Sequence, residues 1–328
     1  MYLLLFPENN ILKIWRTLIK HCRHSIWMNI IQISMMSLSK SKFLKTLVER
    51  QNMNTVKEKI VLITGASSGM GKAFTKALLK EGATVYAVAR RVDAMQELKA
   101  LGAHTLKMDI TNQDDINQVV KTIEKETHGV DILVNCAGFG MYGAMEDTTL
   151  ADARYQFEVN LFGMAYLTQK VLPSMRKKMQ GRIINISSMG GKIYTPLGSW
   201  YHASKHAVEG WSDCLRLELK SFNIDVVVIE PGAIATEFAD VMVQPMLERS
   251  GQSAYSHMAA AVANATHTSV EKGALSDVQV VVDMLMKAVQ ASSPKTRYVG
   301  GKYAKLMIFV RKWFGDRVFD RMVMSVIK

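Results

Sequence analysis

The sequence contains few cysteines. Only Cys22, Cys136 and Cys214 occur among 328 residues, and they are far apart. An odd number of distant thiols argues against a disulfide framework and against a zinc site with closely spaced ligands. We therefore expect free thiols in a reducing compartment, a cytoplasmic location and no bound metal.

Long apolar runs are lacking near the N-terminus, where Tyr2 to Phe6 and Ile30 to Ile33 are the clearest ones. Both are much shorter than the roughly 20 residues that a helix needs to cross a bilayer. Hydrophobic residues nevertheless make up 48% of the chain and charged residues 21%. This balance is typical of a packed globular protein and excludes a disordered chain.

Acidic residues are scarce at the N-terminus. Residues 1–52 hold eight Lys and Arg residues but only two Glu residues, which accounts for half of the net charge of +12. The remaining body is modestly basic and has no basic stripe interleaved with aromatic residues, so we expect no nucleic-acid partner. A helical spacing typical of membrane-surface helices is also present. It is formed by Ile11, Ile14, Trp15, Leu18 and Ile19.

We favour a simpler interpretation of this segment. The pattern of a folded domain begins only near Val56, so residues 1–55 are predicted to be a basic extension that is flexible or outside the functional fold. Met53 is then a candidate for the true first residue. Membrane-surface binding remains the less favoured alternative.

From Lys59 onward, short runs of β-branched residues alternate with longer helical patterns. The predicted strands are Ile60–Thr64, Thr84–Ala89, His104–Met108, Ile132–Asn135, Arg182–Ser187, Ile224–Glu230 and Arg297–Val299. The predicted helices are Gly71–Glu81, Asp93–Leu101, Gln113–Thr127, Leu150–Met179, Trp200–Phe222 and Asp277–Ala291. Val, Ile and Leu on both faces of the main strands indicate helices on both sides of a sheet.

This alternation predicts an α/β fold with a doubly wound parallel sheet, the Rossmann fold, as a single domain over residues 56–300. No Pro- or Gly-rich linker divides it. The pattern loosens over residues 233–272, which we interpret as a lid over the substrate. The amphipathic segment 301–328 could be a lid, an oligomer contact or a membrane-surface helix, with ordinary packing onto the body favoured.

A glycine-rich turn lies between the first strand and the first helix. Glycines there allow a tight turn and let a pyrophosphate approach the helix N-terminus, where free N–H groups favour negative charge. The residues predicted to bind a dinucleotide here are Gly65, Ser67, Ser68, Gly69, Met70 and Gly71. A bare structural turn is the alternative.

The ends of the next strands carry further candidates. Ala89 stands where an NAD-selective site usually has an acidic residue, and Arg90 follows with a side chain suited to a 2′-phosphate. This favours NADP(H) over NAD(H). Asp109 could contact the adenine amino group, and Asn135 begins a turn that could pack near the ribose. Either of the last two could be purely structural.

Tyr201 and Lys205 lie four residues apart on a predicted helix and therefore share a face. The ordinary pKa of tyrosine, about 10, is too high for a base at neutral pH. A nearby ammonium and the positive nicotinamide ring would lower that pKa. Ser188 follows the fifth strand and could orient a substrate oxygen toward Tyr201.

With these motifs in order, the chain resembles the short-chain dehydrogenase/reductase family from about Glu58 to Phe238. The resemblance rests on Thr64–Gly71, Asn135–Gly138, Asn160, Ser188, Tyr201–Lys205 and Pro231–Gly232. Cys136 departs from the family, where Asn is common, which affects packing more than chemistry. The resemblance also implies oligomerisation, as a homodimer or homotetramer, through the two long helices.

The resemblance implies a role for each matching residue. Tyr201 would be the general acid/base, Lys205 would bind the nicotinamide ribose, and Ser188 would polarise the carbonyl. Asn160 would hold a water that relays protons from Lys205. The segment that lines the nicotinamide would comprise Pro231, Gly232 and Thr236.

We therefore expect an NADP(H)-dependent oxidoreductase that interconverts an alcohol and a ketone or aldehyde. Phe and Met residues after Gly232 favour a small hydrophobic substrate, with Trp200, Met189 and Phe139 to Tyr142 as further walls. The main alternative is a non-catalytic dinucleotide-binding sensor or scaffold on the same fold. A lipid-binding protein that uses its basic ends is a third hypothesis.

Overall fold

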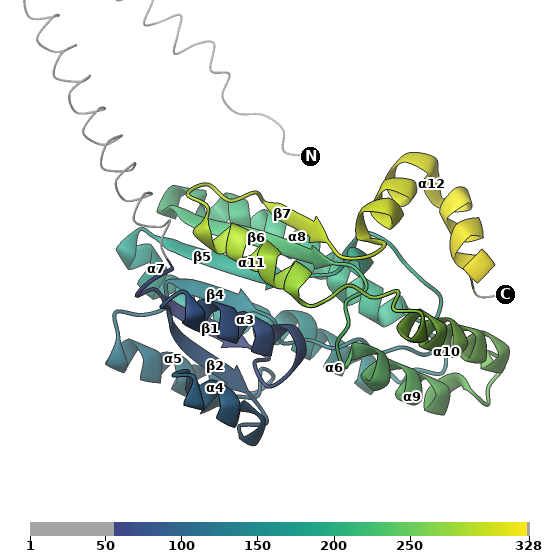
Figure 1. Cartoon of the computed structure of the whole chain (residues 1–328), viewed down its shortest axis with the longest axis horizontal. Coiled ribbons are helices and arrows are strands. Elements are labelled where there is room, and N and C mark those ends of the chain that lie inside the picture. Colours follow the sequence, from purple (N-terminus) through teal and green to yellow (C-terminus); the bar gives the residue numbers. More distant parts are fainter. Residues whose placement is uncertain (1–55, 327–328) are drawn as a thin grey trace, which may run out of the picture. The chain divides into compact units, whose positions relative to one another are not determined.

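The core of the molecule is a seven-stranded parallel sheet in the order β3-β2-β1-β4-β5-β6-β7 (Figure 1). The computed structural model describes residues 56–326, so the predicted N-terminal extension lies outside the described residues. The strands are β1 (Ile60–Thr64), β2 (Thr84–Ala89), β3 (His104–Lys107), β4 (Ile132–Asn135), β5 (Gly181–Ile186), β6 (Ile224–Pro231) and β7 (Arg297–Gly300). The predicted doubly wound parallel sheet is confirmed.

Helices cover both faces of the sheet because side chains alternate along each strand. In β1, Ile60 and Leu62 pack on one face and Val61 and Ile63 on the other. The first face is covered by α5 (Gln113–Glu126), α7 (Gly163–Lys178) and α8 (Ser199–Leu219). The second is covered by α3 (Gly69–Lys80) and α11 (Gln279–Gln290), while the short α4 (Gln96–Ala100) packs beside α3.

Two details differ from the sequence prediction. Strand β3 lies at the sheet edge, where it pairs only with β2, and it is less buried than predicted, since His104 and Lys107 are exposed. The helix predicted over Leu150–Met179 is interrupted. It comprises α6 (Leu150–Phe157), a π-helical turn over Glu158–Phe162 and then α7.

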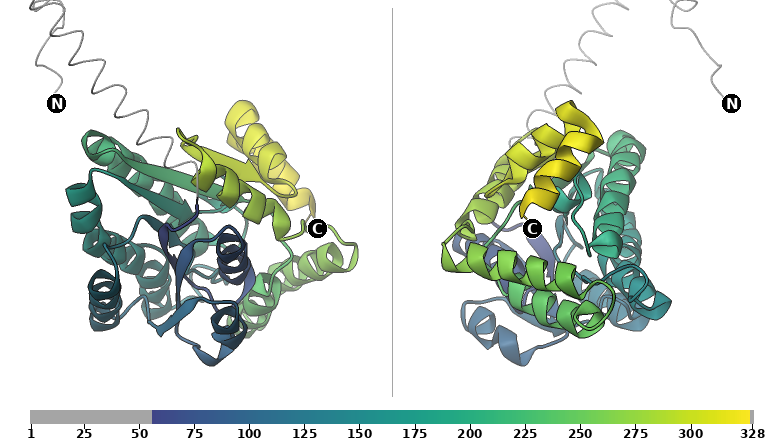
Figure 2. Two further views of the ribbon diagram at one scale, coloured as in Figure 1. Left: turned by 60° about the vertical axis from the view of Figure 1, so that its left-hand side comes forward. Right: turned by 90° about the vertical axis from the view of Figure 1, so that its right-hand side faces the viewer.

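The segment after β6 folds into two helices that the sequence pattern did not reveal, α9 (Phe238–Ser250) and α10 (Ser256–Glu271). They lie side by side beyond the carboxyl ends of the strands (Figure 2). Their contact relies on small residues such as Ala259 and Ala263, packed against Met246. A stripe of alanines gives a weak hydrophobic period, which explains why the prediction failed here.

The chain ends in α12 (Ala304–Val326), which bends sharply at Gly315 with φ 75° and ψ −179°. The bend divides the helix into a first arm, residues 304–314, and a second arm, residues 316–326. The second arm buries Phe319 and Val323 against Ile193. No helix within residues 56–326 is long and apolar enough to cross a bilayer. The helices predicted to mediate self-association keep Leu150, Phe162 and Leu217 exposed, and the oligomer stays a prediction.

Candidate active site

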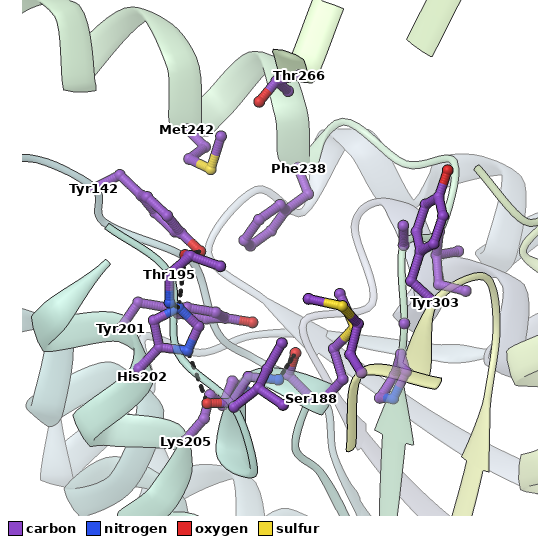
Figure 3. A pocket seen from close by; sticks show the side chains of 18 of the residues that line it. Tyr142, Ser188, Thr195, Tyr201, His202, Lys205, Phe238, Met242, Thr266 and Tyr303 are labelled. Atoms are coloured by element: carbon purple, nitrogen blue, oxygen red, sulfur yellow. Dashed lines mark hydrogen bonds between the residues drawn. The ribbon is translucent and has the colours of Figure 1, made fainter. Parts of the chain in front are cut away.

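A cavity of about 450 Å³ opens at the carboxyl ends of the strands. Parallel strands bring the residues that follow them to one edge, so motifs far apart in the sequence meet here. Figure 3 shows side chains from several elements pointing into this space. Among those that the sequence predicted, the cavity is lined by Met70, Ser188, Tyr201, Lys205, Pro231, Gly232 and Thr236.

The glycine-rich turn allows the backbone to approach closely. A Cβ on Gly71 would lie 2.3 Å from the carbonyl oxygen of Gly65, and one on Gly65 would lie 2.9 Å from the Cα of Ala137. Gly65 also has φ +69°, a conformation that favours glycine. Ser68 precedes α3 without capping it by its side chain, so the first-turn N–H groups remain available to an anion. This backbone cradle fits the pyrophosphate of a dinucleotide.

Two arginines follow β2 at the same edge. Arg90 donates a hydrogen bond from Nη1 to the hydroxyl of Tyr155 at 2.9 Å. Arg91 reaches the glycine-rich turn, where its Nη2 lies 3.4 Å from Ser68 Oγ. The sequence prediction chose Arg90 alone. The adjacent arginine was visible in the sequence, but only the structure shows that its side chain reaches this turn.

The polar residues Asp109, just after β3, and Asn135, at the end of β4, make internal contacts. Asp109 Oδ1 accepts hydrogen bonds from the backbone N–H and the hydroxyl of Thr111, both at 2.9 Å. The buried Asn135 amide donates to Thr168 Oγ1 at 3.2 Å and to Asn185 Oδ1 at 2.9 Å. These contacts favour the structural alternative for both residues, and Asn135 positions the turn rather than reaching into the cavity.

Tyr201 and Lys205 share one face of α8, as their spacing predicted, and both are buried. The Lys205 ammonium donates a hydrogen bond to the carbonyl of Ile186 at 3.0 Å. Burial lowers the pKa of Lys205 to about 8, against the smaller opposing effects of Cys136 and Glu209. A lysine with such a pKa can exchange a proton near neutral pH.

The pKa of Tyr201 is raised above its ordinary value, first by burial and then by the nearby Tyr142. The Ser188 hydroxyl acts in the opposite direction and lowers it. Within the chain itself, burial therefore raises the pKa of Tyr201 more than neighbouring groups lower it, contrary to the sequence prediction. The positive nicotinamide ring of an oxidised cofactor would be needed to lower this pKa.

Asn160 lies in the π-helical turn between α6 and α7, a distortion often found at functional sites. Its Oδ1 accepts a hydrogen bond from the N–H of Phe139 at 3.1 Å, and its amide donates to the carbonyl of Phe139 at 3.0 Å and to Ser204 Oγ at 3.1 Å. A Cβ on Gly138 would meet both Asn160 Oδ1, at 3.1 Å, and Lys205 Nζ, at 3.6 Å. The structure thus brings Asn160 beside Lys205.

His202 is a residue of the site that the sequence analysis missed. It follows Tyr201 on α8 and turns its ring toward the loop after β5. The ring bonds the backbone N–H of Thr195 through Nε2 at 3.0 Å and the carbonyl of Gly190 through Nδ1 at 2.9 Å. The sequence holds no signal for this role, because these partners of the ring are backbone groups of the loop after β5.

Aromatic and thioether side chains surround Tyr201. Its ring centroid lies 5.8 Å from that of Tyr142 and 5.7 Å from that of Phe238. Met242 and Met189 also line the cavity. The prediction that Trp200 forms a wall of the cavity is wrong. Its ring packs edge-on against Phe157, with 6.5 Å between the ring centroids, and does not line the cavity.

Thr236 lies where β6 leads toward α9, close to the glycine-rich turn. A Cβ on Gly69 would lie 3.7 Å from the Thr236 side chain. Gly232 is held against the chain that follows β7, because a Cβ there would lie 2.2 Å from the carbonyl oxygen of Lys302. The segment after β6 therefore lies next to the glycine-rich turn, as a site formed by both would require.

Comparison with known proteins agrees with this geometry. Residues 59–246 match the family model of short chain dehydrogenases. Over 182 residues the chain is 41% identical to the 3-ketodihydrosphingosine reductase of Bacteroides thetaiotaomicron, covering 55% of this chain and 66% of that protein. Over 279 residues it is 34% identical to the NADPH-dependent 3-dehydrocapnine reductase of Ornithobacterium rhinotracheale, covering 81% of this chain and 96% of that protein.

A solved structure is similar as well. The closed form of a serine dehydrogenase complexed with NADP+ superposes with a TM-score of 0.65 at 28% identity, over 74% of this chain and 94% of that one. The family model covers more than half of the chain, and its motifs converge on one cavity. The chain belongs to the short-chain dehydrogenase/reductase family of oxidoreductases.

Proposed function

We propose that this protein is an NADP(H)-dependent oxidoreductase that interconverts an alcohol and a ketone or aldehyde, with Tyr201 as general acid/base. One observation carries the proposal. The hydroxyls of Tyr201 and Ser188 meet in a cavity that also contains Lys205 and the end of the glycine-rich turn.

The bound cofactor supplies or accepts the hydride at its nicotinamide ring. The chain's own residues handle the oxygen of the substrate. The Tyr201 hydroxyl gives a proton to the developing alkoxide, or takes it back in the reverse direction. Ser188 donates a second hydrogen bond to the same oxygen, so charge is stabilised where it grows. Lys205 and Asn160 provide the route by which the proton of Tyr201 is replaced.

Cofactor preference follows from the end of β2. Ala89 carries no charge that would repel a 2′-phosphate. Arg90 and Arg91 place two cations directly after β2, and the side chain of Arg91 reaches the glycine-rich turn. A guanidinium binds phosphate oxygens with paired donors. The relative from Ornithobacterium rhinotracheale is named as NADPH-dependent, which supports the same preference here.

The substrate is proposed to be apolar around its reacting carbon. The rings of Tyr142 and Phe238 lie beside the ring of Tyr201, and Met242 lines the same cavity. Methionine side chains adapt to varied shapes. Two relatives are named as reductases of 3-ketodihydrosphingosine and of 3-dehydrocapnine. We therefore place ketone reduction ahead of aldehyde reduction for this chain.

A panel of hydrophobic ketones and secondary alcohols tests the proposal, with turnover followed by NADPH absorbance and in parallel with NADH. Turnover of at least one ketone, with a higher kcat/KM for NADPH than for NADH, is the expected result. NADPH binding without turnover of any compound would instead support a non-catalytic dinucleotide sensor.

A further inference from the structure

The first arm of α12 exposes a cluster of large apolar side chains. Leu306, Phe309, Trp313 and Phe314 are each 52–68% exposed. The three aromatic rings lie together, since the ring centroid of Phe309 is 6.4 Å from that of Trp313 and 6.0 Å from that of Phe314. Single exposed apolar residues need no explanation, but a contiguous aromatic cluster marks an interaction surface.

Three of these residues form one stripe of the helix. Leu306, Phe309 and Trp313 follow the spacing i, i+3 and i+7, which places them on one face. The opposite side of the arm faces the protein, because Ala304 is buried and Met307 lines the cavity. The stripe therefore faces solvent and is not packed within residues 56–326.

Exposed basic residues occur on both arms of α12, and two of them are on the arm that carries the stripe. Lys305 and Lys312 are exposed on the same arm, and Arg317 and Arg321 are exposed on the second. Within the described part of the chain none of these four takes part in an ion pair, whereas Arg311 pairs with Asp316. The ammonium of Lys312 lies 5.5 Å from the centroid of the Trp313 ring. An apolar stripe with Trp and Phe, bordered by lysines that form no ion pair in the described residues, is the pattern of a helix that lies in an anionic membrane interface.

The same helix borders the candidate active site. Tyr303, Met307 and Met322 line the cavity from this side, and Val270 at the end of α10 lines it next to them. Tyr303 and Val270 are themselves exposed, so part of the cavity lining is open to solvent on this side. Figure 1 shows α12 and α10 at the same end of the fold.

We propose that the first arm of α12 docks on the surface of an anionic lipid bilayer, with Leu306, Phe309 and Trp313 inserted at the interface and Lys305 and Lys312 against the headgroups. The docking itself is independent of the proposed reaction.

A second copy of this chain fits the surface less well. Two copies that met through this arm would bring Lys305 and Lys312 close to their own equivalents, on chains that each carry a net charge of +12. Like charges repel across such a contact, whereas anionic headgroups complement them. Charge complementarity therefore favours the bilayer.

Flotation of the full chain with vesicles tests the proposal. We expect binding to vesicles of equal parts phosphatidylglycerol and phosphatidylcholine, weak binding to phosphatidylcholine alone, and release as salt is raised. The variant Leu306→Ser/Phe309→Ser/Trp313→Ser should lose at least about tenfold in partitioning. The variant Lys305→Glu/Lys312→Glu should lose about tenfold on the anionic vesicles only.

A matched control removes equally exposed apolar residues elsewhere, with Leu101→Ser, Met145→Ser and Leu217→Ser combined, and should bind as the unaltered chain does. Retained NADPH binding and an unchanged melting temperature show that the α12 variants are folded. Full vesicle binding by the two α12 variants would overturn the proposal and assign any lipid affinity to other basic segments, such as residues 1–52.

Sedimentation of the protein without lipid tests the alternative occupant of this surface, a second copy of the chain. The proposal expects the same oligomeric state for the unaltered chain and the triple α12 variant. If that variant alone dissociates to a smaller species, a second copy covers this surface and the membrane assignment is wrong.

Discussion

The ring of His202 ties the Gly190 carbonyl to the helix that carries Tyr201, with 2.9 Å between Nδ1 and the carbonyl oxygen. The tautomer follows from the other nitrogen. The N–H of Thr195 can only donate, so Nε2 accepts and Nδ1 carries the proton. The backbone N–H of Gly190 in turn donates a hydrogen bond to Ser188 Oγ at 3.0 Å. The imidazole therefore connects the helix that carries Tyr201 with the loop that carries Ser188, the two residues with the proposed catalytic hydroxyls.

Replacing His202 with Phe should therefore lower both stability and turnover. The change leaves the Thr195 N–H and the Gly190 carbonyl without partners, at a cost of about 1–3 kcal/mol each. We expect a lower melting temperature, a reduced kcat with a smaller change in KM, and unchanged NADPH binding. An unaltered kcat would show that the loop holds Ser188 in place without the imidazole.

The same ring predicts a loss of stability in acid. Burial lowers the pKa of His202 below its ordinary value of 6.5, and the charge of His206 lowers it further. A depressed folded-state pKa contributes stability that is present above pH 6.5 and is lost as pH falls below it. The melting temperature should thus fall between pH 7 and pH 5 less in His202→Phe than in the unaltered chain. The exposed His257, changed to Phe, is the control and should leave that slope unchanged.

Tyr201→Phe should abolish turnover and leave the cofactor site intact. Removal of a general acid costs about 100-fold or more in kcat. NADPH binding, measured by fluorescence titration, should stay within about twofold, because the glycine-rich turn is untouched. Tyr142→Phe is the matched control, since it removes a neighbouring phenol whose hydroxyl lies 3.5 Å from Thr195 Oγ1. Comparable losses in both variants would contradict the assignment of Tyr201.

The sequence predicted the sheet well because strand signals are local. Strands β1, β2 and β4 begin and end at the predicted residues, and the others differ by about one. The spaced motifs also predicted that Ser188, Tyr201 and Lys205 would lie together, because the topology of a parallel sheet brings strand ends to one edge.

The remaining features depend on tertiary contacts that no local pattern encodes. The π-helical turn at Asn160 is accompanied by hydrogen bonds to Phe139, which is distant in sequence. Trp200 does not line the cavity although its neighbour Tyr201 does, because adjacent residues on a helix point in different directions. The reach of Arg91 to Ser68 depends in the same way on the packing of β2 beside the turn.

Gly71→Ala and Gly210→Ala should have opposite effects. A Cβ at Gly71 collides with the Gly65 carbonyl, so we expect a loss of about 2 kcal/mol or more and weaker NADPH binding. Gly210 is a helical residue of α8 with nothing within 4 Å of its added Cβ. Alanine there should stabilise the protein by about 1 kcal/mol. Denaturant unfolding compares the two, and equal effects would mean that the turn relaxes around the new methyl group.

Arg90→Ala and Arg91→Ala, combined, should change the choice of cofactor. Losing both cations removes charge-assisted hydrogen bonds to a 2′-phosphate and should raise KM for NADPH about tenfold. KM for NADH should change little, because that cofactor has a hydroxyl at this position. Lys107→Ala removes an exposed cation from the neighbouring strand and should affect neither. A parallel rise in both KM values would indicate that the arginines hold the turn rather than the phosphate.

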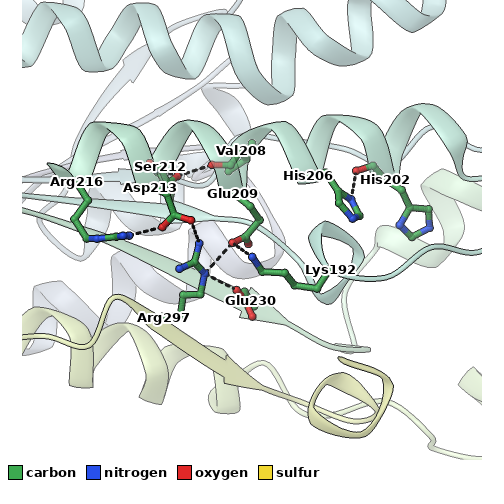
Figure 4. Close-up of polar contacts among 11 residues, drawn as sticks. Lys192, His202, His206, Val208, Glu209, Ser212, Asp213, Arg216, Glu230 and Arg297 are labelled. Atoms are coloured by element: carbon green, nitrogen blue, oxygen red, sulfur yellow. Dashed lines mark hydrogen bonds and ion pairs between the residues drawn. The ribbon is translucent and has the colours of Figure 1, made fainter. Parts of the chain in front are cut away.

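Glu230→Gln should stabilise the protein at alkaline pH. Glu230 and Glu209 are both buried and share Arg297, whose Nε lies 3.1 Å from Glu230 Oε1 and 3.0 Å from Glu209 Oε2 (Figure 4). Burial, followed by the charge of Glu209, raises the pKa of Glu230 to about 7. Lys192 and Arg297 oppose this only in part.

The sign of the pH dependence follows from that raised pKa. Glu230 contributes stability while it is protonated, which is fully present below pH 4.5 and is lost as pH rises through about 7. Glutamine keeps the shape without the charge, so Glu230→Gln should gain on the order of 2 kcal/mol at pH 8 and almost nothing at pH 5. Glu218→Gln, on the exposed side of α8, should change neither value. If Glu230→Gln instead loses stability at pH 8, the carboxylate is ionised there and the attraction of Arg297 outweighs the cost of burial.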